Sequence, residues 1–379
     1  MLREMRLVVA IVAALVVSIS VIPRALFAAG ALPDALRPFI WSDAYLIYAR
    51  SLSGHRLPYV DGPFEYPPLI GAAAAIFSLI AGTPAAFVAL WGALLAACAA
   101  GAALLLTRAA TPSRVAARFA LTPQLLLLGG INFDLLAVLF LVAALIAARA
   151  KHDGRTAVGL ALGAASKLFP LAAAPIAVMR SSRPARSVAL LVVALAACYA
   201  PAIMAGSSAA GSPAFYLLGI PANLDSPGGL IASALASLGI AEAQLIVVVL
   251  SITGLTATYL FGVLPRAKAA DPVSVFGLAI VATLAWSRLY SPQYSLWLLP
   301  LFVLLPLRGR TFALLTLGDL MVFLSIYPLT LVRWPAGDVR VTGLMLLLVA
   351  GVLTRHLALL CSWRELRQLA AAPPPRPAR

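Results

Sequence analysis

The sequence predicts an all-α, polytopic helical membrane protein, and three observations support this prediction. Hydrophobic residues fill 63% of the 379 positions and charged residues only 11%, whereas soluble domains carry about 25% charged residues. Apolar runs of about 20 residues, the length that crosses a bilayer as a helix, recur along the chain. Arg and Lys gather in short clusters between these runs, which is the pattern that the positive-inside rule produces.

The distribution of charge argues against a nucleic-acid-binding protein, although the formal net charge is +15. The basic residues are divided among the connections between spans rather than collected in one patch. Cys98, Cys198 and Cys361 lie in apolar surroundings and form no CxxC pair, so a disulfide framework is not indicated. No polar block is large enough for a separate soluble domain. We therefore expect one integral membrane domain over residues 1–363 and a disordered cytoplasmic tail over residues 364–379.

The first apolar run covers residues 7–27 and follows Arg3 and Arg6, which places the N-terminus in the cytoplasm. A basic start before an apolar run is also typical of a signal peptide, but the length of this run favours an uncleaved span. Residues 28–66 then form a long external loop. The next apolar stretch, residues 67–81, is short and bounded by prolines, so we expect an interfacial or re-entrant helix there.

The remaining runs alternate between the two sides of the membrane. Residues 157–178 have basic clusters on both flanks and are interrupted by Ser166 to Pro170, which predicts a helical hairpin broken near Lys167. Residues 206–241 form a second external segment, and the C-terminus is cytoplasmic. About ten full crossings result, over residues 7–27, 85–107, 115–128, 135–148, 188–205, 243–264, 273–289, 295–307, 311–331 and 341–360.

The external loop concentrates ionisable and aromatic groups that are rare elsewhere in the chain. Its charged and histidine residues are Asp43, Arg50, His55, Arg56, Asp61 and Glu65, and its large aromatic residues include Tyr45, Tyr48, Tyr59, Phe64 and Tyr66. This pattern indicates a site. The alternative is an ordinary polar connector whose tyrosines anchor it at the membrane interface.

Two cations, Lys167 and Arg288, lie at or near membrane depth toward the same external side. A charge in the hydrocarbon region costs a few kcal/mol, about 2.5–3.5 on insertion scales, so such residues are candidates for function. Carboxylates together with two buried cations indicate a site for an anionic ligand and a nucleophile that needs a base. A phosphate attached to a lipid would suit the cations.

Several short motifs resemble those of polyprenyl-phosphate-sugar glycosyltransferases of the GT-C superfamily, in particular glycosyltransferase family 87 and related mannosyltransferases. The resemblance covers residues 41–300. The motifs are Asp43-x4-Tyr48, Gly54-x4-Tyr59, residues 64–69 (FEYPPL), Asn132-Phe133-Asp134, residues 166–170 (SKLFP) and Ser291-Pro292-Gln293-Tyr294-x2-Trp297. The family often has Gly-Gln-x-Asn where this chain has Gly130-Ile131-Asn132-Phe133-Asp134, which leaves the subfamily open.

The resemblance implies a GT-C fold and transfer of a sugar, with mannose favoured, from a polyprenyl monophosphate to a hydroxyl of an external glycan or lipid-linked acceptor. Asp43 would be the general base of an inverting displacement. The donor phosphate would be bound by Lys167, Arg288, Gln293 and Tyr294. We expect the substrates to contact Tyr48, Tyr59, Asp61, Glu65, Tyr66, Asn132 and Asp134. No metal ligand is assigned, although a divalent cation stays open as a cofactor. A bacterial plasma membrane is the expected location.

Other interpretations of the same residues remain open at this point. Asp43 is also suited to cap the helix that follows it, as Asp134 is at residue 135. Lys167 can extend its ammonium from a half-helix to the interface. Arg288 can pair with Asp319, which lies in an otherwise apolar span.

Two further alternatives concern the acids of the external loop and the function of the whole protein. Asp61 and Glu65 could form a metal site, but two acids at this spacing are weak evidence for one. For the whole protein, the alternative to an enzyme is a transporter or flippase of a lipid-linked or anionic substrate, with its charges on broken helices near the bilayer midplane.

Overall fold

The computed structural model describes residues 2–206 and 219–372. These residues form helices and no strands, so the all-α prediction is confirmed for the described part of the chain. The α-helices are α1 (Leu2–Ala28), α2 (Asp43–Ile47), α3 (Pro68–Ile80), α4 (Pro84–Leu106), α5 (Pro112–Val115), α6 (Pro123–Leu128), α7 (Asp134–Arg149), α8 (Asp153–Ser166), α9 (Ala174–Arg180), α10 (Pro184–Ala205), α12 (Pro227–Ser237), α13 (Ala243–Ala257), α14 (Pro272–Ala285), α15 (Leu299–Leu304), α16 (Gly309–Leu331) and α17 (Val339–Ala371). Short 3₁₀ and π turns extend or join these helices. They are η1 (Asp34–Phe39), η2 (Tyr48–Leu52), η3 (Ala116–Ala120), η4 (Phe169–Ala173), η6 (Thr258–Val263), η7 (Leu264–Arg266) and η8 (Pro292–Trp297).

Six helical segments within the described residues are long and apolar enough to cross a membrane. They agree with six of the expected crossings, and the protein is accordingly membrane-embedded. The six segments are Leu2–Ala28, Pro84–Leu106, Pro184–Ala205, Ala243–Arg266, Gly309–Leu331 and Val339–Ala371. The count of ten full crossings is not confirmed.

The other four expected crossings are shorter or broken helices. Helix α7 has 16 residues and α14 has 14, whereas the segments around α6 and α15 are divided by Pro123 and by the 3₁₀ turn η8. Nearly all of α14 is buried. A helix enclosed by other helices hydrogen-bonds and packs within protein, so it need not match the bilayer thickness alone. These four segments are therefore not confirmed as full spans.

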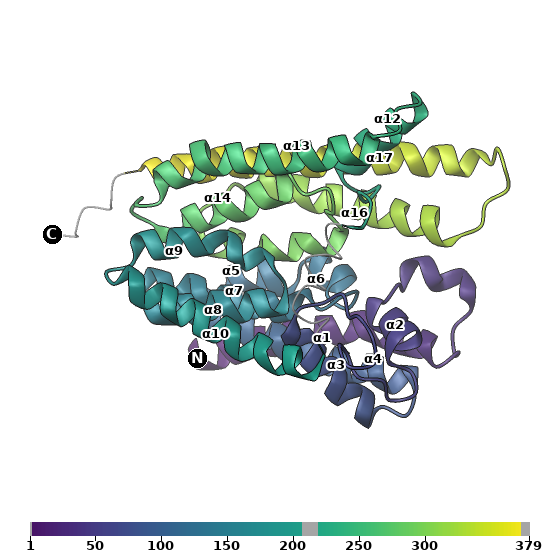
Figure 1. The fold of residues 1–379 in the computed structure, drawn as a ribbon, viewed down its shortest axis with the longest axis horizontal. Coiled ribbons are helices and arrows are strands. Elements are labelled where there is room, and N and C mark those ends of the chain that lie inside the picture. Colours follow the sequence, from purple (N-terminus) through teal and green to yellow (C-terminus); the bar gives the residue numbers. More distant parts are fainter. Residues whose placement is uncertain (1, 207–218, 373–379) are drawn as a thin grey trace.

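The helices divide into two groups along the sequence (Figure 1). Helix α1 packs against α4, and α7 packs against α4 and α8, in the lower part of the view. Helices α13, α14, α16 and α17 run along the upper part, with α16 packed on α17. Contacts of α14 and η8 with α7 join the groups.

The predicted hairpin near Lys167 is confirmed. Helix α8 ends at Ser166, Lys167 is extended (φ −159°, ψ 135°), and η4 and α9 return toward the start of α8. The two ends of the hairpin meet, because Asp153 at the start of α8 accepts hydrogen bonds from Ser181 Oγ at 2.9 Å and from the Ser182 amide at 2.8 Å. The turn thus carries Lys167 to the end of the helix bundle opposite Asp153.

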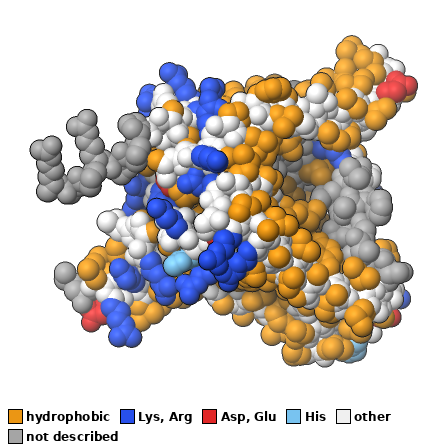
Figure 2. Space-filling view, turned by 60° about the vertical axis from the view of Figure 1, so that its left-hand side comes forward, with side chains coloured by type: hydrophobic (Ala, Val, Ile, Leu, Met, Phe, Trp, Pro, Cys, Tyr) orange, Lys and Arg blue, Asp and Glu red, His pale blue; other side chains and the backbone are white. Residues whose placement is uncertain are grey.

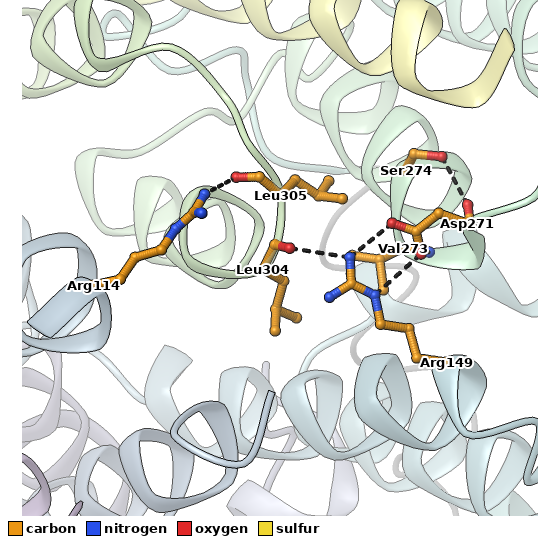
Figure 3. Close-up of polar contacts among 7 residues, drawn as sticks. All are labelled: Arg114, Arg149, Asp271, Val273, Ser274, Leu304 and Leu305. Carbon is orange, nitrogen blue, oxygen red and sulfur yellow. Dashed lines mark hydrogen bonds and ion pairs between the residues drawn. The ribbon is translucent and has the colours of Figure 1, made fainter. Parts of the chain in front are cut away.

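That opposite end differs in charge from the end at which α1 begins and α17 finishes. Lys and Arg side chains gather at the end where α1 begins and α17 finishes (Figure 2). We call this end the basic end, and it carries Arg114, Arg149, Lys151, Arg180 and Lys268. Here Arg149 pairs with Asp271 at 2.7 Å and donates to the Leu304 carbonyl at 3.0 Å (Figure 3). Arg114 donates to the Leu305 carbonyl. These contacts join the two groups of helices.

The expected disordered tail begins at residue 364, but α17 continues to Ala371. Glu365 on this helix accepts hydrogen bonds from the Arg308 amide at 2.8 Å and from Thr311 Oγ1 at 2.6 Å. These bonds hold the end of α17 against the start of α16. The rest of the expected tail, residues 373–379, lies outside the described residues, as do residues 207–218 of the second external segment.

Candidate functional site

A cavity of about 250 Å³ lies where the external loop, the hairpin turn and the loop before η8 meet. Seven of the twelve predicted site residues line it: Asp43, Glu65, Tyr66, Asn132, Lys167, Gln293 and Tyr294. They come from four segments far apart in the sequence. The remaining lining residues are Leu46, Ile47, Arg50, Pro67, Leu168, Ile220, Asn223, Leu289 and Ser291.

Asp43 is held in place by hydrogen bonds on both carboxylate oxygens. Trp41 Nε1 donates to Oδ1 at 2.7 Å, and Asn132 Nδ2 donates to Oδ2 at 2.5 Å. The Asp43 amide also donates to the Ile131 carbonyl at 2.8 Å. The capping interpretation of Asp43 is wrong, because the Ser42 side chain caps α2 by accepting from the Tyr45 amide. Asp43 thus remains oriented toward the cavity.

The environment of Asp43 suits a proton acceptor. Burial raises the pKa of its carboxyl to about 6, while the Trp41 hydrogen bond, the charge of Lys167 and the Asn132 hydrogen bond act in the opposite direction. A carboxylate with a pKa nearer to neutrality is a stronger base than a solvated one and is still ionised at pH 7.

Lys167 faces the same cavity from the hairpin turn. Its ammonium pairs with Asp134 at 3.1 Å and lies 4.7 Å from the centre of the Tyr294 ring. Asp134 is 1% exposed and its other oxygen accepts from Trp297 Nε1 at 2.7 Å. Trp297 is stacked between Phe169 and Tyr294. A buried carboxylate and an aromatic stack therefore fix the lysine, so it does not extend freely to the interface.

Asp134 was predicted to contact substrate, but it does not line the cavity. It is the first residue of α7 and does not cap it. Its position beneath the ammonium makes it the counter-ion that keeps Lys167 charged and oriented. The sequence offered no signal for this pair, because Asp134 at the start of α7 and Lys167 in the hairpin turn are 33 positions apart.

Arg288 also lies outside the cavity lining. Its Nη1 donates to the Ile220 carbonyl, and its own carbonyl accepts from the Asn223 amide at 2.8 Å. Asn223 Nδ2 in turn donates to Ser291 Oγ at 2.9 Å. Arg288 thus holds the segment that carries Ile220 and Asn223, two lining residues, against the loop before η8.

A second buried arginine secures the same loops. Arg355 on α17 is fully buried, and its Nη2 donates to the carbonyls of Asp225 and of Tyr290, the latter at 2.8 Å. Asp319, an acid within the apolar helix α16, accepts hydrogen bonds from Ser295 Oγ at 2.6 Å and from Gln124 Nε2 at 3.2 Å. These buried polar groups hold the loop before η8 and η8 itself against α16, α17 and α6.

Three predicted substrate contacts shape the loop instead of lining the cavity. Tyr48 packs on Phe87. The Tyr59 hydroxyl donates to the Tyr66 carbonyl at 2.5 Å, and Asp61 accepts from the Leu57 amide at 2.7 Å. None of the three lines the cavity, so their contact with substrate stays a prediction.

Arg50, Asn223 and Ser291 line the cavity but were not predicted as site residues. Arg50 pairs with Glu65 at 2.9 Å, and its side chain is 50% exposed, so this pair stands at the mouth. Ser291 belongs to a motif already singled out, next to Gln293, and this proximity was the available signal. Asn223 lies in a Pro-, Gly- and Ser-containing connection with no motif of its own.

A second, mainly apolar cavity of about 340 Å³ adjoins the first. Lys167, Leu168, Leu289 and Tyr294 line both. The other residues of the apolar cavity are Phe169, Ala172, Leu255, Thr283, Ser287 and Trp297. The two cavities therefore share Lys167, with the Asp43 carboxylate in the lining of the first and a mainly apolar lining in the second.

The described residues contain no group of three or more His, Cys, Asp and Glu side chains placed to hold a metal ion. Asp61 is bound to the Leu57 amide and Glu65 to Arg50. The two acids considered for a metal site are thus committed to different protein partners.

No family model matches this chain, and neither the curated proteins nor the solved structures include a similar one. The functional argument therefore depends on the residues and their geometry.

Proposed function

We propose that this protein is an integral membrane glycosyltransferase of the GT-C type, which moves a sugar from a polyprenyl monophosphate to an acceptor hydroxyl. One observation carries the proposal. The carboxylate of Asp43 and the fixed ammonium of Lys167 line one cavity, and a mainly apolar second cavity shares Lys167 and Tyr294 with it. A substrate with a sugar, a phosphate and a long apolar chain matches that sequence of environments.

In this mechanism Asp43 removes the proton of the acceptor hydroxyl. The hydroxyl oxygen attacks the anomeric carbon while the bond from that carbon to the phosphate oxygen breaks. The phosphate leaves with the electron pair, and Asp43 keeps the proton. A single displacement inverts the anomeric centre and needs no covalent intermediate. Support for Asp43 as base comes from its two fixed hydrogen bonds and its pKa of about 6.

The leaving phosphate gains charge as the bond breaks, so fixed donors near it lower the barrier. Lys167 is the cation best placed for this role, since it lies at the junction of the two cavities. Gln293 and Tyr294 line the same wall, where a side-chain amide N–H and a phenolic hydroxyl can donate to the phosphate. Arg288 acts indirectly by holding the Ile220 segment.

The apolar cavity would receive the first part of the polyprenyl chain. Its walls are Phe169, Leu255, Leu289 and Trp297, among others. The acceptor would enter past the Arg50–Glu65 pair. The acceptor class we propose is an external glycan or lipid-linked saccharide, and mannose is the sugar that the motif resemblance favours.

The orientation follows from charge. The basic end would face the cytoplasm and the Asp43 cavity the outside, because positively charged segments remain on the cytoplasmic side. We place the protein in a bacterial plasma membrane with both termini cytoplasmic.

The test uses purified protein in liposomes with radiolabelled polyprenyl-phosphate mannose and a mixed glycan acceptor pool. Wild type should transfer label, and Asp43→Asn should lose about two to four orders of magnitude of turnover, the usual contribution of a general base. Asp338→Asn is the matched control, because Asp338 pairs with Arg340 away from the cavity and an asparagine still caps α17. Equal transfer by Asp43→Asn would remove Asp43 as base. Movement of label across the membrane without transfer would instead establish a transporter.

A further inference from the structure

The basic end contains a cavity that the proposed reaction does not use. It measures about 330 Å³ and lies between the ends of α7, α8, α9 and α14. It shares no lining residue with either cavity of the candidate site. The residues around it are Ala148, Lys151, Asp153, Thr156, Ala177, Arg180, Ser182 and Phe276.

Two cations that line this cavity have N–H donors that are not used in hydrogen bonds within the described residues. Lys151 is exposed, and its ammonium has no ion pair or hydrogen bond within the described residues. Arg180 donates from Nη1 to the Ala267 and Ala269 carbonyls, at 2.7 and 2.6 Å, which leaves its other two nitrogens available to donate to a ligand. By contrast Arg149, which ends α7 close by, is bound to Asp271 and Leu304 (Figure 3).

One carboxylate also lines the cavity, but it is engaged. Asp153 Oδ2 accepts from Ser181 Oγ, Ser182 Oγ and the Ser182 amide, all within 2.8–2.9 Å. These donors offset its charge locally. Two cations against one compensated carboxylate leave an excess of positive charge, which favours an anion.

Lys151 occupies a backbone position that a lysine adopts at a cost. Its φ is +57°, in the left-handed region that glycine enters freely and that other residues rarely do. The turn from α7 to α8 would therefore form more easily with glycine. A lysine in a strained position beside a cavity points to a role for its charge.

We propose that this cavity binds the phosphate headgroup of an anionic membrane lipid from the leaflet at the basic end. Lys151 and Arg180 would contact the phosphate, as basic pockets between membrane helices do with such headgroups. Phe276, Ala148 and Ala177 supply an apolar wall that suits the glycerol and first methylenes of a lipid. A free phosphate ion would leave that wall against water.

The proposal is independent of the glycosyltransferase function and is tested by binding alone. Purified full-length protein in a neutral detergent is titrated calorimetrically with dioctanoyl phosphatidylglycerol, dioctanoyl phosphatidylcholine and inorganic phosphate in separate arms. Saturable binding of the phosphatidylglycerol, tighter than that of the other two probes, is expected. Equal binding of phosphatidylcholine, or phosphate binding as tight as that of the lipid, would overturn the lipid assignment.

Variants separate this site from general surface charge. Lys151→Gly removes the ammonium and relieves the left-handed strain, so affinity for phosphatidylglycerol should fall roughly fivefold, the effect of one lysine near an anionic surface. Its thermal unfolding temperature should equal or exceed that of wild type. Lys268→Ala, at an exposed lysine of the same end outside the cavity, should bind as wild type. Unchanged affinity in Lys151→Gly, or an equal loss in Lys268→Ala, would overturn the proposal.

Discussion

At the residue scale, the candidate site depends on how partners fix two charged groups. Asp43 lies between Trp41 and Asn132, and Lys167 lies on Asp134. In both cases the partner orients the group while burial changes its chemistry. A carboxylate in such a position loses part of its hydration but keeps two donors, so with a pKa of about 6 it is mainly ionised at neutral pH and still accepts a proton readily.

The pH dependence of transfer should follow Asp43. The base works as the carboxylate, so kcat/KM should fall as the pH drops below about 6, the pKa of this group. Asn132→Ala removes a hydrogen bond that lowers this pKa, so the midpoint of the acidic limb should move to higher pH. The measurement is a pH profile of kcat/KM for both proteins. An identical midpoint in the two would contradict this account of Asp43.

Lys167 and Arg288 should differ in their effect on the donor. Lys167→Ala loses a charged contact to the phosphate, worth about 1.5–3 kcal/mol, so the donor KM should rise roughly 10- to 100-fold. Arg288→Ala loosens the Ile220 segment instead, so it should lower the thermal unfolding temperature with a smaller change in donor KM.

Because Lys167→Ala leaves Asp134 buried without its counter-ion, the double variant Lys167→Ala/Asp134→Asn serves as a control for folding. Its asparagine oxygen still accepts from Trp297. Lys167→Arg should recover part of the donor affinity. An equal rise in KM for Arg288→Ala would return that arginine to direct phosphate contact.

The residue types of the site were predictable from the sequence, and their partners were not. Asp43, Lys167 and Gln293 attract attention because polar groups are rare in so apolar a chain. Which polar groups face the cavity depends on pairings between distant segments. Asp134 became a counter-ion and Arg288 a loop support through contacts 33 and 68 positions away, and no local pattern encodes these.

At the element scale, the hairpin of α8, η4 and α9 determines where Lys167 lies. The basic residues on both flanks and the Ser166 to Pro170 interruption were sufficient to predict it, because charge requires both ends on one side. The expected full crossings over 273–289 and 295–307 are not confirmed, because the helices there are shorter than a full span. Their apolar composition reflects burial within protein as much as contact with lipid, and composition alone does not separate the two.

The hairpin turn should be sensitive to a methyl group at Gly163. A Cβ there would lie 2.9 Å from Pro170 Cγ across the turn, closer than carbon atoms approach. Gly163→Ala should therefore lower the thermal unfolding temperature and, by moving the turn, weaken donor binding. Gly82→Ala is the matched control, since a Cβ at Gly82 meets nothing within 4 Å. Equal unfolding temperatures and donor affinities for the two variants would contradict the close packing of the turn.

At the scale of the whole molecule, charge and site occupy opposite ends. The hairpin connects the two ends directly, with Asp153 and Ser182 at the basic end and Lys167 at the Asp43 cavity. Six helices within the described residues are long and apolar enough to span a membrane, and α1 and α17 are the first and last of them. The start of α1 and the end of α17 lie at the basic end (Figure 1). Under the positive-inside rule, we propose that the basic end faces the cytoplasm and that the cavity opens on the other side.

Labelling of single cysteines in intact cells tests this orientation. In a background with Cys98, Cys198 and Cys361 replaced by alanine, Ser53→Cys probes the exposed loop near the cavity and Lys268→Cys the exposed basic end. A membrane-impermeant maleimide should label Ser53→Cys in intact cells and Lys268→Cys only after the membrane is opened. The reverse pattern would place the Asp43 cavity in the cytoplasm. The donor phosphate would then have to be reached from the inner leaflet, and transfer to an external acceptor would be ruled out.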